Sequence, residues 1–236
     1  MSLFGFWARR CRKWLLWIVA VMAAVETVLF VWAIYRSMEG HLEQIITNSG
    51  MPLVAACAFF SLTSALYTIG TDRGAQSSYT LRRLALSERR AFFCRAAHNT
   101  LCYIVLWGAQ LAVALGFCLL WKQMLPKLWG TQTVLLAFYR VPFLHNLLPL
   151  GDWYLYPRNL LWFTAIGCAT AREKRGMLTA MSIMTFHVFR IEMGSVPGLA
   201  VIDMALALLC IVWCTIYPGG AEEDTEKEAV ANGTKA

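Results

Sequence analysis

Residues 14–35 read WLLWIVAVMAAVETVLFVWAIY, an almost unbroken apolar run. At 1.5 Å of rise per residue, a helix of this length crosses a hydrocarbon core about 30 Å thick. Five further apolar stretches of similar length follow along the chain. The sequence therefore predicts an all-α, polytopic membrane protein with six transmembrane helices, at residues 14–35, 51–70, 99–121, 153–171, 177–194 and 198–217.

The composition of the whole chain supports lipid as its solvent. Of 236 residues, 58% are hydrophobic and only 15% are charged, whereas a soluble domain keeps about a quarter of its residues charged. The net charge of +7 comes from Lys and Arg clusters between apolar blocks, which argues against a nucleic acid partner. The eight cysteines form no C-x-x-C pair, so we expect reduced thiols and no bound metal or cofactor in this chain.

The distribution of basic residues sets the expected orientation. With six spans, fifteen of the 21 Lys and Arg fall on one side and six on the other. The positive-inside rule then places both termini in the cytoplasm, and we expect a bacterial plasma membrane. Residues 1–13 mix aromatic and basic side chains, as expected of a cytoplasmic interfacial helix. Residues 218–236 are polar and acidic, which predicts a disordered cytoplasmic tail.

Residues 131–150 are apolar but contain Arg140, Pro142, His145 and Pro149. A seventh span here would move the basic cluster at residues 172–175 to the outer side, against the positive-inside rule. We therefore expect an outer-leaflet or re-entrant helical hairpin, whose broken backbone must be buried in protein or face water.

The longest predicted cytoplasmic connection, residues 71–95, carries most of the functional signal. Ser77 or Ser78 can cap a short helix, and Ser87 can cap a second helix that continues into the third span. The result is a helical corner at residues 84–87, held below the membrane. One interpretation of this loop is a basic anchor for the inner leaflet.

A second interpretation comes from a resemblance. The run YTLRRLALSERR at residues 79–90 resembles the cytoplasmic loop of permease subunits of ATP-binding cassette (ABC) transporters of the type-two exporter class. In that family the loop forms a coupling helix that docks on a separate ATPase subunit, which binds ATP and Mg²⁺. The family commonly has Leu-Pro-apolar-Ser-Arg at the corner, and this chain departs from that pattern at Ala85 and Glu88.

The resemblance implies partners and contact residues. The chain would work with a second permease copy or a related permease and with two cytoplasmic ATPases. It has no G-x-x-x-x-G-K-[ST] phosphate loop, so we expect it not to be an enzyme and ATP to be hydrolysed by another polypeptide. The residues implied at the ATPase contact are Leu81, Arg82, Arg83, Leu84, Leu86 and Ser87.

Charged residues inside the predicted spans are candidates for a translocation path. Glu26 lies near the middle of the first span, where an ionised side chain must be paired or hydrated unless it is protonated. Both a substrate or proton path and a hydrogen bond between helices fit it. Asp203 in the sixth span and Arg190 near the end of the fifth can approach each other as a structural ion pair. 

Further polar residues surround the predicted outer hairpin, where they can line a vestibule. Interfacial snorkelling explains Arg158 equally well. The members of this group are Arg140, His145, Asp152 and Arg158.

Two other functions fit the same composition. A small intramembrane enzyme, such as a lipid-modifying transferase or a protease, would use Glu26, Asp203 or His187, but the sequence has no E-E-x-x-R, H-E-x-x-H or G-x-S-x-G array. A non-catalytic partner that assembles or regulates another membrane complex shares every compositional feature of a permease. The sequence leaves the substrate open.

Overall fold

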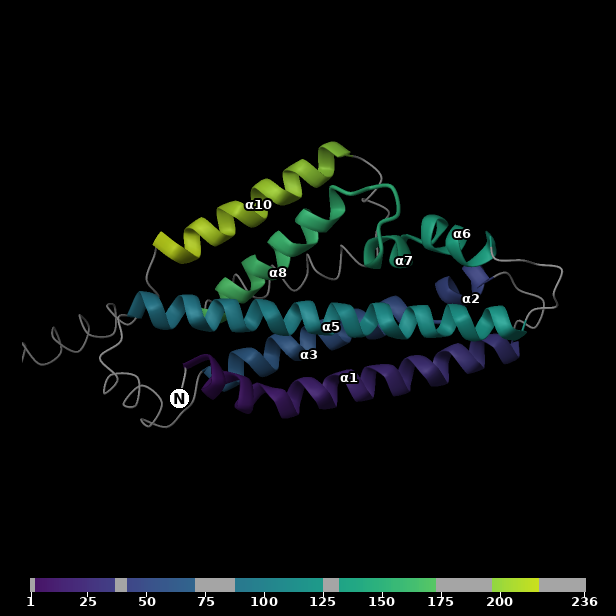
Figure 1. The fold of residues 1–236 in the computed structure, drawn as a ribbon, viewed down its shortest axis with the longest axis horizontal. Coiled ribbons are helices and arrows are strands. Elements are labelled where there is room, and N and C mark those ends of the chain that lie inside the picture. The colour runs from purple at the N-terminus through teal and green to yellow at the C-terminus, as the bar shows by residue number, and fades with distance from the viewer. Residues whose placement is uncertain (1–2, 37–41, 71–87, 125–131, 173–196, 217–236) are drawn as a thin grey trace, which may run out of the picture.

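The structure is a computed structural model that describes residues 3–36, 42–70, 88–124, 132–172 and 197–216. Every regular element in these ranges is a helix, which confirms the predicted all-α class. The helices (Figure 1) are α1 (Leu3–Arg36), α2 (Leu42–Asn48), α3 (Met51–Gly70), α5 (Glu88–Met124), α6 (Gln132–Arg140), α7 (Pro142–Leu147), α8 (Leu155–Ala171) and α10 (Pro197–Ile216).

Two of the described helices are long and apolar enough to cross a membrane by themselves. The crossing segments are Cys11–Arg36 within α1 and Arg89–Gln123 within α5. A third crossing results if α2 and Met51–Tyr67 of α3, which are bent by 45° at their junction, form one broken span. The apolar segment Ala200–Ile216 of α10 is shorter. The fold is thus compatible with a membrane protein.

The helices follow the predicted apolar segments closely along the chain. α3 has the predicted bounds, and α8 and α10 differ from the predicted segments by at most two residues at either end. α1 and α5 extend past the predicted segments because the flanking polar residues continue each helix. α1 includes most of the predicted interfacial helix with no break before the first apolar segment. Residues 177–194 lie outside the described part of the chain.

The predicted outer hairpin consists of two short helices, α6 and α7. Val141 between them has an extended backbone (φ −87°, ψ 114°), because the ring of Pro142 disfavours the helical conformation in the residue before it. α6 has nine residues and α7 has six, whereas a span needs about 20. Phe138 and Leu144 are fully buried, and both helices pack against α5. Neither helix alone is therefore long enough to cross a membrane.

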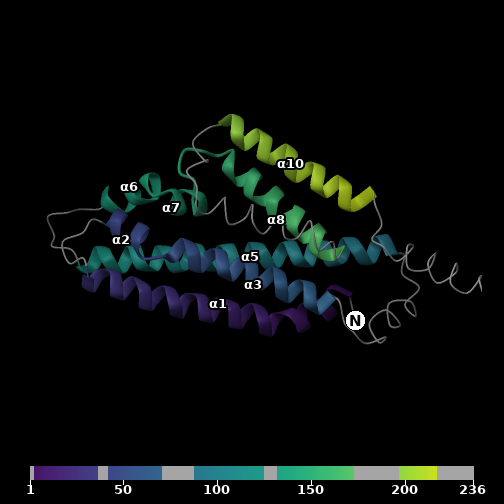
Figure 2. The same ribbon diagram turned by 180° about the vertical axis from the view of Figure 1, so that it is seen from behind.

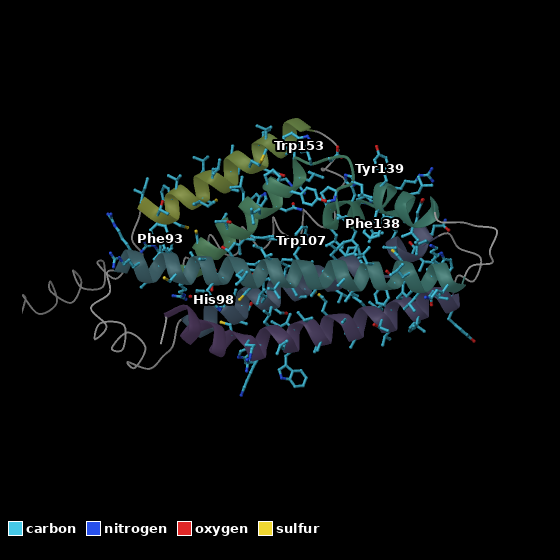
Figure 3. All side chains as sticks on the ribbon, viewed as in Figure 1. Phe93, His98, Trp107, Phe138, Tyr139 and Trp153 are labelled. Atoms are coloured by element: carbon cyan, nitrogen blue, oxygen red, sulfur yellow. The ribbon has the colours of Figure 1, made fainter. Side chains whose placement is uncertain are left out.

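α5 lies at the centre of the bundle. α1 and α3 pack against one side of it, α8 packs against the other, and α10 lies outside α8 (Figures 1 and 2). Rings of Phe59 from α3, Tyr103 from α5 and Phe163 from α8 stack in the core, with centroids 5.8 to 6.4 Å apart. Trp107 of α5 adds to this cluster, 6.1 Å from Phe163 (Figure 3). The core therefore sits where α3, α5 and α8 meet.

The two ends of the bundle differ in composition. At one end α1 begins, α3 ends, α5 begins, and α8 and α10 end (Figure 1). We call it the basic end, because its described residues include Arg9, Arg10, Arg12, Lys13, Arg89, Arg90 and Arg172. The opposite end, which we call the hairpin end, holds α2, α6 and α7. Tyr139 and Trp153 are exposed there (Figure 3).

Candidate functional site

The residues expected to contact an ATPase fall between two helices whose ends are described. Leu81, Arg82, Arg83, Leu84, Leu86 and Ser87 themselves lie outside the described residues. α3 ends at Gly70 and α5 begins at Glu88, both at the basic end (Figures 1 and 2). In the first turn of α5, Arg89 and Arg90 are exposed. The connection therefore starts and finishes at the basic end.

Arg172 joins three helices at the basic end. Its guanidinium lies over the ring of Phe92 of α5, 4.2 Å from the ring centroid. Its Nε donates a hydrogen bond of 2.9 Å to the carbonyl oxygen of Cys214 on α10. As the residue that follows α8, it also places a positive charge at the negative end of that helix dipole. A residue expected only as a topology signal thus holds α5, α8 and α10 together next to the start of α5.

Buried polar side chains form a stripe along α5. Asn99, Tyr103 and Gln110 are spaced by four and seven residues, which places them on one side of the helix, and all three are buried. Asn99 Nδ2 donates to Thr170 Oγ1 of α8 at 3.0 Å. The Tyr103 hydroxyl shares a hydrogen bond of 2.8 Å with Thr63 of α3. The stripe therefore joins α5 to both of these neighbours.

Glu26 and Gln110 form the third cross-link of the stripe, between α1 and α5. Gln110 Nε2 lies 2.8 Å from Oε1 and 2.9 Å from Oε2 of Glu26, and it donates to both. The exposed fraction of each side chain is zero. The pair lies between the two helices that are long enough to cross a membrane. Of the candidate residues that the structure describes, Glu26 is the acid buried most deeply.

α5 and α8 approach each other closely at Gly167. A Cβ atom at this position would lie 2.5 Å from Thr100 Oγ1 and 3.0 Å from the carbonyl oxygen of Ala96. Small residues at such contacts let helix backbones pack together, as is common between helices in membranes. The hydrogen bond from Asn99 to Thr170 lies at the same contact. A glycine is therefore needed for the observed distance between α5 and α8.

At the hairpin end, the candidate residues fall into an exposed pair and a part-buried pair. Arg140 forms an ion pair with Glu43 of α2 at 3.4 Å, and its side chain is 61% exposed. His145 Nε2 lies 2.9 Å from Asp152 Oδ2. An exposed ion pair such as Arg140–Glu43 contributes little to stability. The first pair connects α6 to α2, and the second connects α7 to the turn before α8.

Arg158 belongs to neither pair. It is buried, with only 2% of its surface exposed. Its guanidinium donates hydrogen bonds of 3.0 Å to Oδ1 of Asn146 and of Asn159. It therefore does not reach outward to the interface, so the snorkelling interpretation is wrong for this residue. Asp203 lies in α10, and Arg190, its predicted partner, lies outside the described residues.

Gln110 is the functional candidate that the sequence interpretation missed. Its bond with Glu26 joins residues 84 positions apart, and no local pattern specifies that pairing. The positions of the two residues along their predicted spans do, however, indicate that they could meet. Glu26 comes 12 residues after the start of the first predicted span at Trp14, and Gln110 comes 11 residues after the start of the third at Asn99. The first and third predicted spans run in the same direction, so offsets that differ by one residue place the two side chains at nearly the same depth.

The chemistry available at this site is polar contact and proton binding. Among the described residues, no group of three or more His, Cys, Asp or Glu is placed to hold a metal ion. The partner of Glu26 is an amide, which is neither a nucleophile nor a general base. The chain matches no protein-family model, no curated protein and no solved structure.

Proposed function

We propose that this chain is a permease subunit of an ATP-driven exporter of the ABC type, with six spans and both termini in the cytoplasm. In this proposal two copies, or one copy and a related permease, enclose the path of the solute. Separate ATPase subunits bind the loop at residues 71–95 and supply the energy. The substrate class stays open.

One observation carries the proposal: the connection from Gly70 to Glu88 starts and finishes at the basic end of the bundle. Positive charge on one side of a membrane protein marks the cytoplasmic side. The described helix ends there supply Arg12, Lys13 and Arg172 in addition to the arginines that open α5. This arrangement supports a cytoplasmic position for the loop, where an ATPase can reach it.

The length of α5 supports a mechanical role for the same connection. Its 37 residues make a continuous helix about 55 Å long, at 1.5 Å per residue. It starts directly after the loop and contacts α1, α3, α6, α7 and α8. A displacement of Glu88 by a bound partner would therefore pass along α5 to helices at both ends of the bundle.

The proposal is tested by copurification from native membranes. The variant Leu84→Asp/Arg83→Glu should lose a polypeptide that contains a G-x-x-x-x-G-K-[ST] phosphate loop, while the permease stays inserted at its normal level. The matched control is Lys227→Glu/Ala231→Asp, which makes the same change of charge in the acidic tail and should retain the ATPase. Equal recovery from both variants, or no ATPase with the wild type, would reject the docking role.

Orientation is tested separately. An epitope inserted after Gln76 should be inaccessible to antibody in intact cells and accessible after permeabilisation. Staining of intact cells would place the loop outside, and the exporter proposal would fail with the orientation.

A further inference from the structure

The Glu26 carboxyl group lies in surroundings that do not suit a negative charge. Its side chain has no exposed surface, and Gln110 is its hydrogen-bond partner among the described residues. Neither of the ion pairs found in the described residues, Arg140–Glu43 and His145–Asp152, includes it. An ionised carboxylate in a bilayer is normally paired with a cation or hydrated, because otherwise its desolvation is costly. 

The second observation concerns the other end of the Gln110 amide. Gln110 Oε1 is buried, and no described group donates a hydrogen bond to it. A buried acceptor without a donor is costly, and native proteins rarely leave one. Oε1 and Nε2 lie at the edge of one planar amide, so a shift of the Gln110 side chain that sets this edge parallel to the carboxyl group would bring Oε1 to one carboxyl oxygen while Nε2 stays at the other. In that orientation a carboxyl group must supply the donor.

We propose that Glu26 carries a proton in the folded protein and donates it to Oε1 of Gln110, while Gln110 Nε2 donates to the other carboxyl oxygen. The resulting acid–amide pair has two reciprocal hydrogen bonds and no net charge. It satisfies the orphan acceptor and removes the buried charge in one step. The site is a proton-binding site between α1 and α5.

This proton site goes beyond the proposed transport function. It requires that α1 and α5 lie in a membrane, but it requires neither an ATPase nor a solute. It also assigns the amide a specific role, because only a side chain with both a donor and an acceptor completes the pair. Failure of the docking experiment above would leave this inference untouched.

The test is infrared spectroscopy of the full-length chain in lipid nanodiscs at neutral pH. An un-ionised carboxylic acid has a carbonyl stretch that is separate from the carboxylate and amide bands. The wild type should show this band, and it should persist after transfer to D₂O with only the shift that deuteration causes. A wild-type spectrum without the band would overturn the proposal, whatever any variant does.

Three variants assign the band. Glu26→Gln should abolish it while keeping the fold, because two amides can form the same reciprocal pair. The swap Glu26→Gln/Gln110→Glu should restore it at a similar frequency. Asp203→Asn is the matched control, since it removes an acid from a second apolar helix, and this variant should retain the band.

A band that survives in Glu26→Gln, or disappears in Asp203→Asn, would assign the acid elsewhere and overturn the proposal. Should Glu26→Gln fail to fold, Gln110→Met gives the assignment instead. Loss of the amide acceptor should move the wild-type band to higher frequency, and an unmoved band would contradict the pair.

Discussion

α5 and α10 are both long helices of the same bundle, and they differ in what they bury. α5 contacts most of the other described helices and buries the polar stripe of Asn99, Tyr103 and Gln110. α10 is the more apolar helix, packs mainly on α8 and exposes most of its large side chains. In a protein solvated by lipid, apolar surface provides little drive for helices to associate. The position of a helix therefore follows its polar and small residues rather than its hydropathy.

The largest expected effect comes from Gly167→Val, which tests whether close packing fixes α5 at the centre. The added atoms would overlap Thr100 Oγ1 and the backbone of α5, and overpacking of this kind costs about 3 kcal/mol. The unfolding midpoint in mixed micelles with sodium dodecyl sulfate measures the loss. Gly116→Val on α5 is the control, since nothing lies within 4 Å of its Cβ position. An equal loss in both would show that helix propensity, not packing, sets the effect.

The next effect is that of Gln110→Leu, which tests the polar stripe directly. Removing the amide leaves a buried carboxyl group without its partner, at a cost of about 2 kcal/mol in unfolding free energy. The same micelle unfolding assay applies. Gln123→Leu, at an exposed position near the end of α5, should change stability by less than about 0.5 kcal/mol. An unchanged stability of Gln110→Leu would mean that Glu26 finds another partner. The polar stripe would then not explain the central position of α5.

Arg172→Met tests the attachment of α10 and should cost about 1 kcal/mol, because the stacking on Phe92 and the bond to Cys214 are lost. The rate at which a thiol reagent labels buried cysteines distinguishes loosening of α10 from loosening of α5. Cys214 on α10 and Cys118 on α5 both have an exposed fraction of zero. Labelling of Cys214 should accelerate while that of Cys118 stays constant, and Arg90→Met should change neither. Equal acceleration of both thiols would mean that Arg172 supports the whole bundle.

The smallest expected effect is that of Tyr103→Phe, which removes one hydroxyl from the stripe. Thr63 Oγ1 still donates to the carbonyl oxygen of Phe59 at 2.9 Å, and single interhelical hydrogen bonds in membrane proteins contribute about 0.6 kcal/mol. A loss near that value in the micelle assay is expected. Tyr139→Phe, at an exposed position, serves as the control and should be neutral. A loss above about 2 kcal/mol would indicate a larger polar network around Tyr103.

The helices could be predicted from the sequence because lipid imposes a simple rule on chain length. About 20 apolar residues are needed to cross the hydrocarbon core, and the apolar run at residues 51–70 gives both ends of α3. The break in the hairpin was also predictable, since Pro142 disfavours a helical conformation at Val141. Six spans, the cytoplasmic termini and the ATPase contact stay predictions.

The contacts between helices could not be predicted in the same way. Asn99 and Thr170 are 71 residues apart, and hydropathy does not specify which helices become neighbours. The burial of Arg158 was missed for a related reason. Its partner Asn146 precedes α8, so its environment depends on how α7 folds back against that helix. Depth matching of polar residues in parallel spans is the signal that would have found Gln110.

The separation between Glu26 and Gln110 also has a consequence for biosynthesis. Ribosomes add about 5 to 20 residues per second, so the 84 residues between the two take on the order of ten seconds to make. α1 is therefore complete well before its partner emerges from the ribosome. During that interval the nascent chain must shelter the Glu26 carboxyl group with water, with the insertion machinery or with a proton that it has already acquired.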